Sequence, residues 1–202
     1  MRTIAAFLML VPLLAQGELE EYLSLCHRTL ENAGEGELYD PEYCNRAAEM
    51  GSAEAHYVMG GYYSMVLDWE KAKQHYQASI DGGFIWGHIG MGHSLITSDP
   101  EAAEKHYRIV AKSGDETAIV ALSFIGDLRV HDEEFLEAYS WFYACFHFDT
   151  YAREFCKIKM QRLVKYLDEE QIQHAVEGAQ AIIDWFSDNN ALNTDAGEAG
   201  AG

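Results

Sequence analysis

Apolar residues recur along most of this chain at the spacing of an α-helix. Ala55 and Met59 lie one helical turn apart, as do Ala72 and Tyr76, so each segment would present one apolar stripe to a neighbour. The chain has only 3 prolines against 17 glycines, which favours many helices separated by glycine. We therefore predict an all-α fold with enough chain to bury a core.

The helical segments repeat along the sequence. The segment Gly51–Gly60 (GSAEAHYVMG) aligns with segments that begin at Gly83 and at Gly114. A second matching segment follows each of the three, and its aligned aromatic residues are Tyr76, Tyr107 and Phe142. A period in the low thirties with two helices per unit predicts a solenoid of stacked αα-hairpins.

Small residues and helix-boundary signals support these units. We expect Gly60, Gly92 and Ser123 to allow close approach between helices. Asp99 followed by Pro100 is typical of a helix start, because Asp caps the first turn and Pro is tolerated there. The glycines at 82, 83 and 114 are typical of helix ends, where a left-handed residue satisfies the last carbonyls.

The repeat pattern resembles a known family. The first unit reads G-x-A-x-A-x-x-x-M-G and then D-x-x-K-A-x-x-x-Y, and the third contains EAYSWF over 137–142. These motifs, across residues 44–147, resemble the Sel1-like repeat family, a relative of the tetratricopeptide repeat. The resemblance implies a right-handed superhelix of αα-hairpins. The chain departs from the family at His75 and His106, where Trp is usual. It also departs in the first helix of the third unit, which lacks the terminal Tyr.

Four segments flank the repeats of residues 51–147. Residues 1–15 predict a signal peptide, because Arg2 precedes an apolar run too short to span a bilayer. A buried N-terminal helix is the alternative. Residues 16–50 predict a helix pair that resembles a degenerate repeat. Residues 148–186 predict two capping helices, the second of which starts at a capping box of Asp168 and Gln171. Residues 187–202 show no apolar periodicity, so we expect a disordered tail.

Four cysteines follow the signal segment, and an even number in an exported chain indicates two disulfides. Four cysteines allow three connectivities. We favour Cys26–Cys44 and Cys145–Cys156, because each pair is close in sequence and lies on successive helical segments. Metal thiolates are the alternative, although no C-x-x-C spacing occurs. Paired cysteines in an exported array also resemble the cysteine-rich Sel1-like proteins of bacteria, which implies a periplasmic or secreted location.

The charge balance limits the possible partners. Asp and Glu number 33 against 14 Lys and Arg, which gives a formal net charge of −19. Nucleic acid and anionic membrane surfaces are disfavoured, because both require clustered basic residues. No later segment is apolar enough to cross a bilayer, so we expect no membrane insertion after signal removal. The one basic stretch lies between Tyr151 and Tyr166.

Local motifs give little support for catalysis or metal binding. His56 with His88, and His75 with His106, occupy equivalent repeat positions, so facing imidazoles could share a metal. The repeat alone explains this recurrence, and no H-E-x-x-H pair occurs, so we predict no metal and no cofactor. No G-x-S-x-G elbow occurs, and we predict that the chain is not an enzyme. An envelope enzyme or cell-wall-binding protein, as described for some cysteine-rich Sel1-like proteins, is the alternative.

An aromatic strip is the more specific candidate for a site. Helical repeats present their first helices on the concave face. The positions beside the packing stripes of these helices are Tyr57, Trp86, Ile89, His93 and Phe124. Packing between repeats is the alternative role for these residues. We predict an exported adaptor or scaffold that binds a protein or peptide with basic flanks, because an acidic surface surrounds the strip.

Overall fold

The computed structural model describes residues 16–29, 41–114, 117–148 and 150–198, and side chains as far as residue 190. The predicted signal peptide lies outside these residues. Within them the regular structure is helical and contains no β-strand, which confirms the all-α prediction. The chain divides into two compact units, Met1–Ser94 and Leu95–Gly202, which are described in turn.

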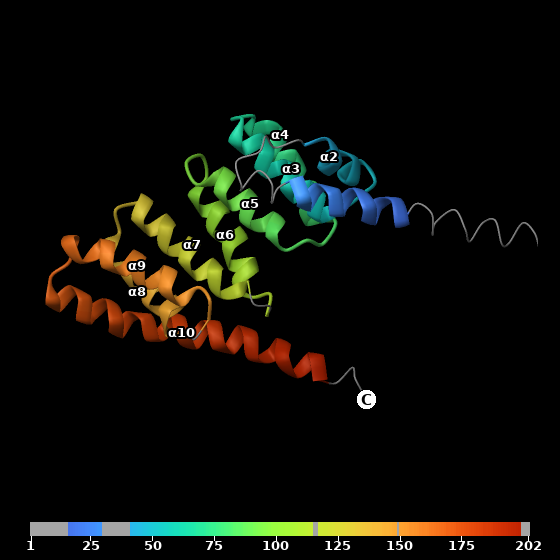
Figure 1. Ribbon diagram of the computed structural model, residues 1–202. Coiled ribbons are helices and arrows are strands. Elements are labelled where there is room, and N and C mark those ends of the chain that lie inside the picture. Colours follow the sequence, from blue (N-terminus) through green and yellow to red (C-terminus); the bar gives the residue numbers. More distant parts are fainter. Residues whose placement is uncertain (1–15, 30–40, 115–116, 149, 199–202) are drawn as a thin grey trace, which may run out of the picture. The chain divides into compact units, whose positions relative to one another are not determined.

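The first unit begins with a helix over residues 16–29 and continues with four further helices. These are α2 (Glu42–Glu49), α3 (Ala53–Met65), α4 (Trp69–Asp81) and α5 (Trp86–Leu95, which ends at the unit boundary). The Cys26–Cys44 disulfide joins the first helix to α2. Helix α3 packs on both α2 and α4, and α3 and α4 form an antiparallel hairpin (Figure 1).

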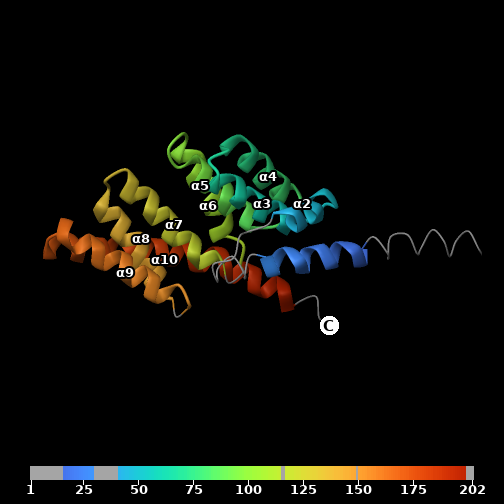
Figure 2. The same ribbon diagram turned by 45° about the horizontal axis from the view of Figure 1, so that its top comes forward.

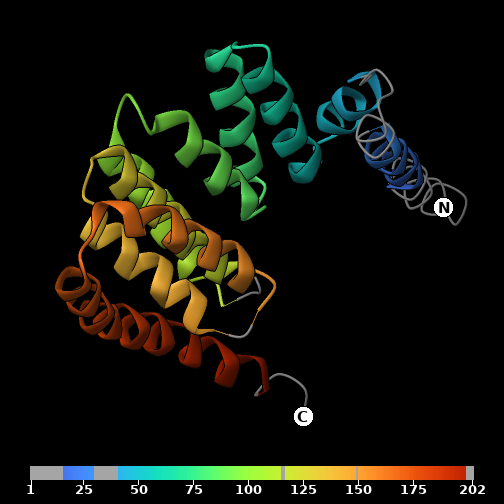
Figure 3. The ribbon, with the colours of Figure 1, turned by 60° about the vertical axis from the view of Figure 1, so that its left-hand side comes forward.

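The second unit contains five α-helices and a short 3₁₀ turn (Val164–Tyr166) among its described residues. The α-helices are α6 (Pro100–Ala111), α7 (Ala118–His131), α8 (Phe135–His147), α9 (Arg153–Leu163) and α10 (Glu169–Glu198). Helix α7 packs on α6 and on α8, and α8 also contacts α9 and α10 (Figures 2 and 3). The Cys145–Cys156 disulfide joins α8 to α9, so both predicted pairings are confirmed.

Several predicted boundary signals are confirmed by hydrogen bonds. The Asp99 side chain accepts from the Ala102 N–H at 3.0 Å, with Pro100 in the first turn. Asp168 and Gln171 form a reciprocal capping box: each side chain accepts from the other residue's backbone N–H, at 2.8 and 2.9 Å. Gly83 and Gly114 have positive φ angles of 83° and 75°, as expected of a left-handed helix end.

The aligned aromatic residues form the cores of the units. Tyr76, Tyr107 and Phe142 are all buried. The Tyr76 ring lies against Gly60 and Gly90, where an added Cβ would come within 2.5 and 2.2 Å of ring carbons. The Phe142 ring lies against Gly126 in the same way, at 2.5 Å. Glycine at these positions is therefore required by ring packing between helices.

One close approach was not singled out in the sequence. Ser123 is buried, as expected of a small residue between packed helices, and Gly126, three residues later, lies against the Phe142 ring.

The prediction for the tail needs correction. Helix α10 continues past Phe186 to Glu198, so residues 187–198 are helical where we expected disorder, and residues 199–202 lie outside the described residues. The Asn190 side chain donates to the Ala111 carbonyl at 3.0 Å and fastens this extension to the end of α6. Because this contact is polar, the extension needs no periodic apolar residues, and the apolar pattern of the sequence therefore did not predict it.

Among the described helices, none combines the length and apolar character needed to span a bilayer.

Candidate functional site

The predicted strip residue Tyr57 lies at the centre of an aromatic cluster in the first unit. Its ring centroid is 5.7 Å from that of Phe84 and 6.2 Å from that of Trp86. We refer to Tyr57, Phe84 and Trp86 as the Tyr57 cluster. Phe84 follows the left-handed Gly83, and its N–H donates to the Ser79 carbonyl at 3.0 Å, which fixes the turn that leads into α5. All three side chains are partly exposed.

Tyr57 is neutral at physiological pH. Burial raises the pKa of its phenol, and the neighbouring Tyr76, with a ring centroid 6.1 Å away, raises it further. The hydroxyl therefore stays protonated and would offer a ligand one donor and one acceptor beside two apolar rings. Tyrosine and tryptophan in such settings are the side chains that most often anchor protein interfaces.

The other strip residues of the first unit differ in exposure. Ile89 is only 2% exposed, so it belongs to the core and the prediction that it lines a binding surface is wrong. The reason is that α5 also lies against α4, through Gly90 and Tyr76, which turns Ile89 inward. His93 is exposed near the end of α5.

In the second unit, Phe124 lies beneath a basic side chain. Its ring centroid is 5.5 Å from that of Tyr107, and the Lys159 Nζ of α9 lies 6.0 Å from the Phe124 ring. Lys159 forms an ion pair with Asp127 and also lies over Phe142 and Phe155. Burial lowers the pKa of Lys159, which Asp127 partly opposes. A residue of the one basic stretch thus covers an aromatic surface with its ammonium group.

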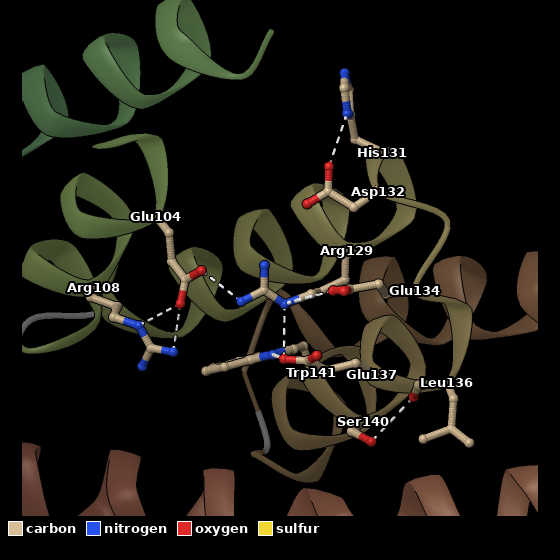
Figure 4. A network of polar contacts seen from close by, with 10 residues as sticks. All are labelled: Glu104, Arg108, Arg129, His131, Asp132, Glu134, Leu136, Glu137, Ser140 and Trp141. Atoms are coloured by element: carbon tan, nitrogen blue, oxygen red, sulfur yellow. Dashed lines mark hydrogen bonds and ion pairs between the residues drawn. The ribbon is translucent and has the colours of Figure 1, made fainter. Parts of the chain in front are cut away.

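A polar network joins α6, α7 and α8 in the second unit (Figure 4). At its centre Arg129 donates from Nε to Glu137 Oε1 at 2.8 Å and from Nη2 to Glu104 Oε2 at 2.6 Å. Arg108 donates to the other oxygen of Glu104 at 2.7 Å, and its guanidinium lies 5.1 Å from the Trp141 ring centroid. Each helix therefore contributes a charge that a neighbouring helix neutralises.

The pKa values of this network match a structural role. Burial would raise the pKa of Glu104, but the hydrogen bonds from Arg129 and Arg108 outweigh it and lower the pKa. The pKa of Arg129 is raised: burial opposes this, but the hydrogen bonds of Glu137 and Glu104 outweigh it. Both groups stay charged at neutral pH and hold each other, so neither is poised to transfer a proton.

Two histidines of the first repeat form a pair that alignment of the repeats did not predict. The Nδ1 atoms of His56 on α3 and His75 on α4 are 3.0 Å apart, and the His75 ring stacks on Tyr63. Burial lowers the pKa of both imidazoles, and for His75 the positive charges of His56 and Lys71 lower it further. Both rings are therefore neutral at pH 7, where one Nδ1–H donates to the other Nδ1. Alignment had paired each of these residues with its counterpart in the next repeat.

The described side chains form no cluster suited to a metal ion. In the part of the chain that the structure describes, no group of three or more His, Cys, Asp or Glu side chains is arranged to hold one. All four cysteines are in disulfides, so the alternative of metal thiolates is wrong.

Comparison with known proteins shows that no protein-family model and no curated protein sequence matches the chain.

Proposed function

We propose that this chain is an exported helical-repeat adaptor of the Sel1-like type, which binds a protein or peptide through its first helices. In this proposal the hairpins stack as a right-handed superhelix. The Tyr57 cluster and His93 supply the contact surface of the first unit, and Phe124 that of the second. The ligand would be an extended or helical peptide segment.

The observation that carries this proposal is the Tyr57 cluster. Tyr57 on α3 meets Trp86 of α5 and Phe84 of the preceding turn, yet all three side chains keep part of their surface exposed. Tyr and Trp lose little side-chain entropy on binding and bury a large apolar area, so a partly exposed group of such rings favours recognition. The exposed His93 adds a polar group near the end of α5.

Charge and redox chemistry support the rest of the proposal. A formal net charge of −19 would steer a ligand with Lys or Arg flanks toward the surface. Two disulfides with no free cysteine are typical of proteins in oxidising compartments, which supports a periplasmic or secreted location.

Peptide selection tests this function and does not require the partner to be identified first. The purified protein would be used to select binders from a displayed library of random peptides, and the affinity of synthesised winners would be measured by calorimetry. We expect winners with an apolar anchor and basic flanks. Trp86→Ala should weaken their binding by about tenfold or more, since a central Trp anchor typically contributes that much.

Two further variants make the result interpretable. His93→Ala removes an exposed side chain and leaves the core intact, so weaker binding by this variant supports the location independently of any effect of Trp86 on folding. Phe155→Ala removes a partly exposed ring on α9 and should leave the affinity unchanged. Peptides that bind wild type and Trp86→Ala equally well would contradict the proposed site.

A further inference from the structure

The corner between α3 and α4 exposes an almost continuous run of apolar side chains. Met65, Val66, Leu67 and Trp69 are 79%, 54%, 70% and 47% exposed. We refer to these four residues as the apolar corner; it lies at the end of the α3–α4 hairpin (Figure 3). Consecutive apolar side chains in water are costly, and on soluble proteins they mark contact sites.

The second unit provides an internal comparison. Leu67 and Glu133 both have a left-handed backbone, with φ of 63° and 61°, at the corners that follow α3 and α7. Each corner is closed by the same type of bond, from Asp68 N–H to the Tyr63 carbonyl at 2.9 Å and from Glu134 N–H to the Arg129 carbonyl at 2.8 Å.

The two matching corners differ in chemistry at the left-handed residue and the residue before it: Val66 and Leu67 stand where the second unit has Asp132 and Glu133. The α7–α8 corner is formed by Asp132, Glu133 and Glu134, all exposed. Because the same backbone accepts Glu where α3–α4 has Leu67, the fold does not require apolar residues there.

The side chains around the corner indicate the kind of surface it contacts. Tyr62 and Tyr63, on the last turns of α3, have ring centroids 5.3 Å apart, and the Lys71 Nζ lies 5.0 Å from the Tyr63 ring. Trp69 lies in the same exposed run as the aliphatic side chains of Met65, Val66 and Leu67. Tyr and Trp rings beside aliphatic side chains are the arrangement found at the boundary between lipid and water.

The charges beside the corner match a zwitterionic surface. Lys71 pairs with Asp68 at 3.2 Å and Lys73 pairs with Glu70 at 2.8 Å, so the first turns of α4 are neutral overall. Because these lysines are already paired with carboxylates, they form no basic patch that would select an anionic headgroup. An anionic bilayer would instead repel a chain with a formal net charge of −19.

We propose that the apolar corner binds a zwitterionic lipid bilayer by shallow insertion of Met65, Val66, Leu67 and Trp69 into its interface. The contact does not span the bilayer, but it departs from the expectation above of no membrane insertion after signal removal. It goes beyond the proposed peptide binding and uses other residues, so Trp86→Ala should retain it and the two proposals can fail separately.

Vesicle binding tests the proposal directly. The purified protein would be floated with phosphatidylcholine vesicles and its partition coefficient measured. Leu67→Glu copies the residue found at the matching corner, so its fold should be unchanged, but it should lower the partition coefficient by at least about tenfold. Glu133→Gln, at the matching left-handed position, is the control and should bind as wild type does.

Fluorescence and lipid charge give independent readouts. Addition of phosphatidylcholine vesicles should shift the tryptophan emission to shorter wavelength, and Trp69→Phe should abolish this shift while the other three tryptophans remain. Absence of wild-type binding, or equal binding by Leu67→Glu, would overturn the proposal. So would binding that requires anionic lipid and is lost in Lys157→Glu, because it would assign the contact to α9.

Discussion

Replacement of Phe142 by alanine should lower the free energy of unfolding of the second unit by about 3–5 kcal/mol. The ring is 1% exposed and packs against Gly126 of its own hairpin, together with Met160 and Leu163 of α9. Its removal leaves a cavity that rigid helices on both sides cannot fill. Denaturant unfolding followed by circular dichroism measures the loss.

Phe155→Ala is the matched control for this substitution. Phe155 has the same side chain and also contacts the Lys159 ammonium, but it is 48% exposed. The Phe155→Ala substitution should lower the free energy of unfolding by less than about 1 kcal/mol, as substitutions at exposed positions generally do. If the two variants lost equal stability, Phe142 would not be the core of the hairpin.

Removal of the Cys145–Cys156 bond should give the second largest effect. The double variant Cys145→Ala/Cys156→Ala frees a cross-link between residues 11 apart and should cost about 3 kcal/mol on the chain-entropy model. The bond joins α9 to α8, whose shared core includes Met160 and Leu163. Hydrogen exchange should therefore show loss of protection in α9 first, because its outer face is exposed.

Removal of the Cys26–Cys44 disulfide is the control that shows whether the loss of protection is confined to the unit that holds the bond. Cys26→Ala/Cys44→Ala should lower protection in the helix over residues 16–29 and in α2, and leave α9 unchanged. A loss of protection that spread evenly over the chain in both variants would contradict the division into two compact units.

Short-range patterns in the sequence predicted much of the fold. Helical spacing, the Asp99 cap and the Asp168–Gln171 capping box depend on residues within one turn, and the structure confirms each of them. The disulfides were predictable because each pair lies on successive helices. Alignment of repeats also identified Tyr76, Tyr107 and Phe142, which are buried as equivalent core rings should be.

Contacts that depend on small changes in register were not predictable in this way. Gly114 is separated from α7 by two more residues than Gly51 is from α3, and the Phe142 ring lies against Gly126, which the alignment did not single out. Ile89 was assigned to the surface from its place on one helix, but the approach of Gly90 to Tyr76 turns it inward.

Interactions between distant polar residues left no sequence signal. The Glu104–Arg108 pair is four residues apart on one helix and could have been found, but Arg129 reaches Glu104 from the next helix. The Asn190 contact with the Ala111 carbonyl likewise joins residues far apart in the chain. The apolar corner was visible in the sequence as MVLDW at 65–69, but only its exposure distinguishes it from a core segment.

In the α3–α4 and α7–α8 hairpins, an aromatic ring of the second helix packs on a glycine of the first. Adjacent glycines of α3 test this packing, because a Cβ on Gly60 would lie 2.5 Å from the Tyr76 ring, whereas a Cβ on Gly61 meets nothing within 4 Å. Gly61→Ala should stabilise the protein by about 0.5–1 kcal/mol through helix propensity, whereas Gly60→Ala should destabilise it by about 1–3 kcal/mol through overpacking. Changes in unfolding free energy of opposite sign at these neighbouring positions are the predicted result. Stabilisation by both substitutions would contradict the packing of Tyr76 on Gly60.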